Sequence, residues 1–234
     1  MIKKMEFNPE RRKFGEILTG GLLFTIGGSG IITNRAGAHG KKDFPQGIRD
    51  MRGEVKINGS PVEQGFTVSP GDTVTTGKGG MVIFVHEQSV YRIGGNTRFT
   101  LTTENDGGGT KSILKIARGK VLSVFRGGRK QVRTPTAVIG VRGSGIYAEA
   151  EPERTYFCTC YGISEISARG GGERETVKAK HHDQPRFIHA PGSGKRIVKA
   201  PMLNHTDKDL IFIESLAGRK PPFWDPFDYN SDGY

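Results

Sequence analysis

The chain has 234 residues, of which 34% are hydrophobic and 9% aromatic, which is enough to bury one main core and too apolar for a disordered protein. Its formal net charge of +11 admits anionic partners. However, its lysines and arginines are spread along the chain, without a basic stripe that also carries aromatic residues, so we expect no nucleic-acid binding. The 35 glycines and 12 prolines, scattered through short apolar runs, favour an all-β fold over a helical bundle.

Residues 1–38 have the three-part plan of an export signal. A polar and basic stretch at 1–13 precedes an apolar, glycine-rich run at 17–32, and the small residues AGA follow at 36–38. The apolar run is shorter than the roughly 20 residues that span a bilayer. We therefore expect the signal to be cleaved, with membrane attachment only if it is kept as an anchor.

The leader also indicates a route of export. Arg11 and Arg12, followed by a lysine and a phenylalanine, resemble the twin-arginine signal, which is read by a translocase that moves folded proteins. Cleavage after Ala38 leaves a mature chain with a net charge of +8. We expect this chain in the periplasm.

A polar lead-in at 39–52 is followed by short segments with alternating apolar and polar residues, bounded by Gly, Asn or Pro. They are GEVKING, TVTTG, MVIFVHEQSVYRIGG, RFTLTT, SILKIARGKVLSVFRGG, KQVRT, AVIGVRG, GIYAEA and RTYFCTCYG. Residues 104–111, ENDGGGTK, read as a polar turn between two of them. The pattern predicts an all-β fold of many short strands, arranged as a single rolled sheet or as a two-sheet sandwich.

Three segments of this region resemble a known family. GEVKINGSPVEQGFTVSPGDTVTTGKGGMVIF, LKIARGKVLSVF and VRTPTAVIGVRGSGIYAE are together similar to the FecR-type periplasmic domain, named for the ferric dicitrate sensor of bacteria. The similarity covers residues 53–168, and we place the whole domain at 53–189. It implies an exported β module for interaction or sensing, and it does not carry over transcriptional signalling. Sensors of this family carry an anti-sigma segment before a membrane helix, whereas a short leader precedes the domain here.

The most specific part of the resemblance is TPTAVIGVRGSGIY. Pro135 stiffens the entry to a strand, Gly140 and Gly143 permit tight backbone turns, and Arg142 is a candidate for a clamp on a buried carboxylate or carbonyl group. Ser144 stands where the family usually has a threonine. HEQS at 86–89 likewise replaces the usual Asp-Gly-Ser turn.

Residues 190–234 differ in character from the domain. A linker-like stretch at 190–201 precedes a short helix, for which Thr206 is the N-cap, Asp209 completes a capping box and Gly218 gives the stop. We expect the helix to form a lid on the sheet. The tail RKPPFWDPFDYNSDGY concentrates aromatic residues among prolines and aspartates, so it either wraps the domain or docks on an envelope protein complex in extended form.

The sequence offers no catalytic constellation. It has no Ser, His and acid set at a recognisable spacing, no glycine-rich nucleotide loop and no paired carboxylates in an apolar setting. We therefore expect a protein that is not an enzyme. Two classes of function remain, a binding or sensing module and a metal or iron-sulfur carrier for electron transfer.

Both cysteines of the chain, Cys158 and Cys160, lie in the segment YFCTCYG. On an extended strand they point to one face, while Phe157, Thr159 and Tyr161 point to the other. A disulfide between them is one reading, but residues two apart on a strand are roughly 6.5 to 7 Å apart at Cα, near the limit of disulfide reach. A second reading is a pair of unbonded buried thiols, which an oxidising compartment makes a liability.

The third reading is a metal site. His181 and His182 follow in KAKHHDQPRFIH, and two thiolates with two imidazoles form a tetrahedral set suited to zinc. Copper and a 2Fe-2S cluster are the alternatives. Because adjacent histidines on a straight strand face opposite ways, both bind only if the backbone turns there, and otherwise His189 or Tyr161 completes the set.

We predict that replacing Arg11 and Arg12 together by lysine leaves the precursor in the cytoplasm, because the twin-arginine translocase reads that pair. Cell fractionation and sequencing of the mature N-terminus measure the result, which for the unaltered chain is a start at His39. Normal export of the variant would contradict the twin-arginine route.

Overall fold

The computed structural model describes residues 45–192 and 194–225, apart from the side chain of Ser144, so the expected export signal lies outside the described residues. The described part contains fourteen β-strands and one helix, α1 (Asp207–Leu216), which confirms the all-β prediction. The strands are β1 (Gly47–Arg52), β2 (Val55–Ile57), β3 (Ser60–Pro61), β4 (Thr73–Thr76), β5 (Met81–His86), β6 (Ser89–Ile93), β7 (Arg98–Asn105), β8 (Thr110–Val124), β9 (Arg129–Arg133), β10 (Ala137–Ala150), β11 (Arg154–Ala168), β12 (Arg174–Ala179), β13 (Arg186–His189) and β14 (Ile197–Lys199).

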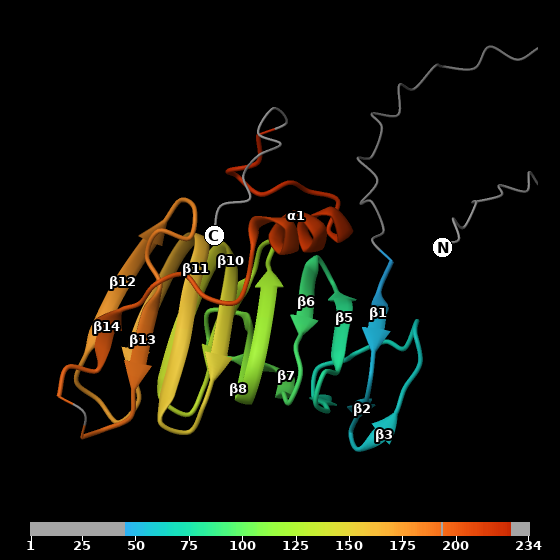
Figure 1. The fold of residues 1–234 in the computed structure, drawn as a ribbon, viewed down its shortest axis with the longest axis horizontal. Helices are drawn as coiled ribbons and strands as arrows, with labels where there is room; N and C mark the ends of the chain where they lie inside the picture. The colour runs from blue at the N-terminus through green and yellow to red at the C-terminus, as the bar shows by residue number, and fades with distance from the viewer. Residues whose placement is uncertain (1–44, 193, 226–234) are drawn as a thin grey trace, which may run out of the picture. The chain divides into compact units, whose positions relative to one another are not determined.

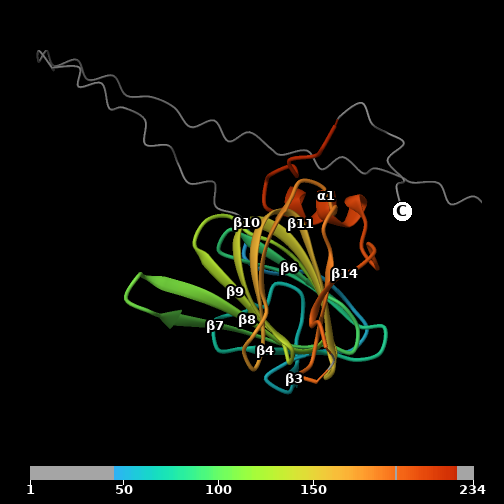
Figure 2. The same ribbon diagram turned by 90° about the vertical axis from the view of Figure 1, so that its left-hand side faces the viewer.

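The strands form one hydrogen-bonded sheet that is rolled into two layers (Figures 1 and 2). One layer has the order β1-β5-β6-β8-β10-β11-β13-β14. The other has the order β3-β2-β4-β7-β8-β9-β10-β11-β12. Three long strands, β8, β10 and β11, belong to both layers, because each pairs with different neighbours along its two halves.

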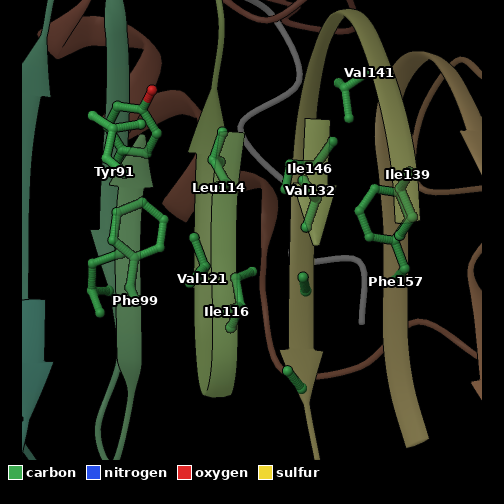
Figure 3. Close-up of a cluster of buried hydrophobic side chains, with 14 of the residues drawn as sticks. Tyr91, Phe99, Leu114, Ile116, Val121, Val132, Ile139, Val141, Ile146 and Phe157 are labelled. Carbon is green, nitrogen blue, oxygen red and sulfur yellow. The ribbon is translucent and has the colours of Figure 1, made fainter. Parts of the chain in front are cut away.

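Apolar side chains between the two layers form the inner core, and Figure 3 shows members of it from β6 to β11. The labelled ones are Tyr91, Phe99, Leu114, Ile116, Val121, Val132, Ile139, Val141, Ile146 and Phe157. Strand β5 shows how the layers are built, since Val82 and Phe84 enter the inner core while Ile83 and Val85 face the other way.

The opposite side of the first layer carries a second group of buried residues, the outer cluster, which packs against α1. Its members are Met81, Ile83, Val85, Val90, Leu122, Val124, Tyr147, Tyr156, Cys158, Cys160, Tyr161, Leu210, Ile213 and Ala217. Figure 1 shows α1 above the ends of β8 and β6. The helix is therefore a lid on the sheet, as its sequence predicts.

The ends of α1 follow the predicted capping chemistry. Thr206 is the N-cap, and its side chain accepts a hydrogen bond from the Asp209 backbone while the Asp209 carboxylate accepts one from the Thr206 backbone. Gly218 ends the helix with a φ of 66°. Leu210 and Ile213 lie on one face of the helix and reach the outer cluster.

Three local expectations differ from the structure. The polar lead-in at 39–52 contains strand β1, because Ile48 is fully buried in the inner core. The linker-like stretch at 190–201 contains strand β14, where Ile197 is buried. Arg142 does form a carboxylate pair, with Glu165 at 3.1 Å, but its side chain is 75% exposed, so the expected buried clamp is wrong.

Gly119 lies where β8 passes from one layer to the other. Gly119 has a φ of 94°, and a Cβ atom there would stand 2.5 Å from the Thr97 Cα atom. We expect Gly119→Ala to lower the free energy of unfolding by about 3 kcal/mol, because the backbone is left-handed and the added methyl group would clash with Thr97 in the turn between β6 and β7. Gly127→Ala is the matched control, since its φ of 63° is also left-handed but its surroundings are open. It should cost about 1 kcal/mol in urea denaturation, and equal losses would contradict the steric argument.

Candidate metal centre

Strand β11 carries one extra residue at Cys160. Thr159 stands opposite Ile146 of β10 and Tyr161 stands opposite Gly145, so Cys160 has no partner in the register of these two strands. Such a β-bulge breaks the regular alternation of side chains and turns the following residue to a new direction. The bulge therefore decides which way the end of YFCTCYG faces.

The two thiols lie on the same side of the sheet, as expected for positions two apart. Cys158 and Cys160 are both fully buried in the outer cluster, whereas Phe157 lies in the inner core. Tyr161 joins the cysteines in the outer cluster, so its expected position on the opposite face is wrong. The physical reason is the bulge, which places two consecutive side chains on one face.

His182 reaches the thiols from the turn between β12 and β13. Its backbone N–H donates to the Cys160 carbonyl oxygen at 2.9 Å, which fastens the turn to the bulge. Its φ of 51° is left-handed, and the Lys180 N–H donates to the Asp183 carboxylate across the same turn. The backbone thus turns at the two adjacent histidines, and only His182 faces the cysteines.

His205 supplies a second imidazole from the segment just before α1. Its Nδ1 lies 2.7 Å from the Leu203 carbonyl oxygen, and because a carbonyl only accepts, Nδ1 carries the proton. Nε2 therefore presents a lone pair toward the thiols. The Tyr147 ring stacks on this imidazole with 4.4 Å between centroids and fixes its plane.

The four donor atoms converge on one point inside the outer cluster. Cys158 Sγ lies 3.6 Å from His182 Nδ1, and Cys160 Sγ lies 3.5 Å from His205 Nε2. The two nitrogens are 2.9 Å apart, and all four atoms lie within 4.8 Å of one another. All four residues are buried, so this Cys2His2 group could hold a metal ion shielded from water.

The surroundings of Cys158 and Cys160 favour the thiolate form of one of the two side chains. The pKa of Cys158 lies well below its ordinary value, chiefly because the Cys160 thiol donates a hydrogen bond to it, and the neighbouring imidazoles of His182 and His205 lower the pKa further. Burial raises the pKa of Cys160, and the neighbouring Cys158 charge adds to the rise. One cysteine is thus already suited to binding a cation, while the other would release its proton to solvent when a metal binds.

The structure brings together three of the four residues that the sequence suggests as ligands. Cys158, Cys160 and His182 come together, but His181 points away from them. Its Nε2 lies 2.8 Å from both carboxylate oxygens of Asp207, the first residue of α1. His205 occupies the fourth position instead.

The two residues considered as substitutes lie elsewhere. His189 is in β13, and its backbone pairs with Arg196. The Tyr161 hydroxyl donates to the Glu214 carboxylate of α1, and Arg219 holds the other oxygen of that carboxylate at 2.6 Å. This buried network fixes the far end of α1 and leaves Tyr161 no role as a ligand.

His205 carries little signal in the sequence. It stands 45 residues from Cys160 and directly precedes the N-cap Thr206, which explains the local pattern without any ligand role. A single histidine beside a helix cap does not indicate a metal site. Only the docking of α1 on the sheet brings it to the thiols.

The described part of the tail packs on the domain. Phe223 contacts the outer cluster, and its ring stacks on His181 with 4.1 Å between centroids. Lys220 lies over the ring of Trp224. Residues up to 225 therefore wrap the domain, which is one of the two arrangements that the sequence leaves open.

Both cysteines are free thiols in the structure. Each is instead within hydrogen-bonding distance of an imidazole nitrogen. The disulfide reading is therefore not the one that the structure adopts.

Comparison with known proteins finds one matching family. Residues 72–159 match the family model described as FecR protein, which agrees with the resemblance seen in the sequence. The match lies inside the predicted domain at 53–189 and includes Cys158, but it ends before Cys160, His182 and His205. No curated protein matches the chain.

Two solved structures are similar to the described fold. They are crystal structures, at 1.65 and 2.50 Å resolution, of a candidate anti-sigma factor from Parabacteroides distasonis. The first is 14% identical, with a TM-score of 0.45, over 62% of this chain and 74% of that one. The second is 13% identical, with a TM-score of 0.44, over 60% and 71%. Among the residues that the structure describes, no helix has the length and apolar character needed to cross a membrane.

Proposed function

We propose that this FecR-domain protein is an exported, non-catalytic binding or sensing module that holds one zinc ion between Cys158, Cys160, His182 and His205. The observation that carries the proposal is the convergence of four buried donors of the right chemistry on one point. Two thiolates and two neutral imidazoles neutralise a divalent ion and form the tetrahedral set that zinc prefers.

The distances support a single tetrahedral ion. Bonds of about 2.3 Å to sulfur and about 2.05 Å to nitrogen hold these atoms about 3.6 Å apart on a tetrahedron. The two sulfur to nitrogen distances are 3.6 and 3.5 Å. The two imidazole nitrogens are closer, at 2.9 Å, and need to separate by only about 0.4 Å to match the same geometry.

The surroundings of the two histidines also favour a metal. A metal-bound histidine commonly donates its other ring N–H to a carbonyl or carboxylate, which fixes the tautomer. His205 does so to Leu203, so its Nε2 faces the thiols. His182 presents Nδ1 to Cys158, and its Nε2 lies 3.1 Å from Asp207 Oδ1 without the angles of a hydrogen bond.

A metal or iron-sulfur carrier is the second candidate, but the same distances disfavour a 2Fe-2S cluster. In a cluster with two cysteines and two histidines, each pair binds a different iron, so sulfur and nitrogen ligands are well separated. Here each sulfur has a nitrogen within 3.6 Å. Copper fits the space, although an electron-transfer copper site usually has one cysteine with a weak axial ligand.

A zinc ion in this position would act as a structural staple. Its ligands come from β11, from the turn after β12 and from the segment before α1, so one ion would join three parts of the chain that are distant in sequence. Four protein ligands leave no open position for a substrate, which supports a role without catalysis.

Export and metal loading fit together in this proposal. Zinc inserted in the cytoplasm would be carried across the membrane inside the folded domain by a twin-arginine route. The exported chain would reach the periplasm with both thiols already bound and so protected from oxidation.

We predict one zinc per chain in protein purified without a metal-binding tag, measured by elemental analysis together with a visible spectrum. The Cys158→Ser, Cys160→Ser double variant and the His205→Ala variant should lose the ion, because each removes direct ligands from a closed set. A coloured protein would indicate copper or an iron-sulfur cluster instead.

His189→Ala is the control, since this histidine is half-buried and lies outside the group, and the variant should keep one zinc. Far-ultraviolet circular dichroism shows whether each variant retains its β structure. Substoichiometric zinc in the unaltered protein, or full occupancy in the double-cysteine variant, would overturn the proposal.

We further propose that the partner is a protein complex of the cell envelope and that the end of the tail binds it. Residues 226–234 bring Phe227, Tyr229 and Tyr234 among aspartates, a composition suited to docking on another protein. The preceding residues 220–225 belong to the domain instead, because Phe223 packs on the outer cluster.

Two truncations test this partner. Removing residues 226–234 should abolish co-purification with envelope proteins after cross-linking in cells and leave the melting temperature unchanged. Removing residues 220–234 should also lower the melting temperature, because it uncovers His181 and the outer cluster. Unchanged co-purification of the shorter truncation would contradict the docking role.

A further inference from the structure

His182 has a second ring nitrogen that the zinc centre does not use. The side chain is only 4% exposed, and its Nε2 makes no hydrogen bond within the described part of the chain. The nearest carboxylate oxygen, Asp207 Oδ1, is 3.1 Å away but does not meet the angles of a hydrogen bond. A buried polar atom without a partner is costly and calls for a physical explanation.

Two further donors face the same point. His181 Nε2 lies 2.8 Å from both oxygens of Asp207, and the donor atoms of His181, His182 and Asp207 lie within 4.8 Å of one another. This group is distinct from the Cys2His2 group and shares only His182 with it. The Cys2His2 group faces Nδ1 of the His182 ring, and Asp207 faces Nε2 of the same ring.

We propose that His181, His182 and Asp207 form a second metal site, in which the His182 ring bridges a divalent first-row transition ion to the zinc. The proposal rests on the zinc centre, because Nδ1 of His182 must be committed to that ion. Binding of the second ion replaces the Nε2 proton of His182, and this proton passes to solvent.

The spacing of the donors fits such an ion. Ligands about 2.1 Å from an ion and at right angles to one another stand about 3.0 Å apart. The separations of the two histidine nitrogens from the Asp207 oxygens are 2.8 and 3.1 Å. Two imidazoles and a carboxylate suit tetragonal or octahedral ions, and Cu(II) binds such nitrogen and oxygen sets most tightly among the divalent ions of this series.

The site is open on one side only. The side chain of His181 is 47% exposed, whereas that of Asp207 is 9% exposed. Phe223 stacks on one face of the His181 ring and holds it in place. An ion here would thus be held by three protein donors and keep positions for water or an exchangeable ligand, unlike the closed zinc centre.

A simple ion pair between His181 and Asp207 is the competing explanation. It accounts for the 2.8 Å contacts of those two residues. It does not account for the buried Nε2 of His182, which remains without a hydrogen bond. The two explanations differ in whether the folded, zinc-loaded protein takes up another ion.

The test uses the full mature chain without a tag, loaded with zinc and then equilibrated with one equivalent of Cu(II). After desalting, elemental analysis should give one zinc and one copper per chain. Electron paramagnetic resonance should show copper coupled to nitrogen and without sulfur ligation. The His181→Ala variant should keep its zinc and lose the copper, as should Asp207→Asn.

His189→Ala is again the control and should retain both metals. Zinc without copper in the unaltered chain, copper that displaces an equal amount of zinc, or copper retained in His181→Ala would each overturn the second site while leaving the zinc proposal intact. A chain that holds no zinc would overturn both.

Discussion

The extra residue at Cys160 is the constraint on which the outer face of the roll depends. By interrupting the register of β10 and β11, it turns Tyr161 to the same face as the two thiols and leaves the Cys160 carbonyl free to accept from His182. The Tyr161 hydroxyl then anchors α1 through Glu214. One local irregularity thus positions the turn and the helix that bring both imidazoles to the cysteines.

The outer cluster contains more polar chemistry than a packing surface requires. Thiols, imidazoles and the carboxylates of Asp207 and Glu214 are buried there beside apolar side chains of the sheet and of α1. Burying such groups is unfavourable unless each finds a partner, and the network of Glu214 with Arg219 shows how one of them is satisfied. The proposed zinc ion would satisfy the four converging donors in the same way, which links the proposed function to the stability of this face.

Much of the fold could be predicted from the sequence because it depends on local patterns. Alternating segments mark the strands, and the capping residues Thr206, Asp209 and Gly218 mark the ends of α1. The strands β1 and β14 escaped prediction because they are short and depend on one buried residue each, Ile48 and Ile197. Their pairing is decided by neighbours that are far away in the chain.

The sequence by itself determined that the two thiols share one face of a strand, because side chains two apart on a strand point the same way. It also determined that histidines at 181 and 182 follow within reach of a turn. Only the tertiary structure decided which imidazoles meet the thiols. His205 lies 45 residues beyond Cys160 and is brought to the thiols by the docking of α1 on the sheet. A ligand set is a property of positions in space, and side-chain directions in turns and before helix caps are fixed by packing rather than by local periodicity.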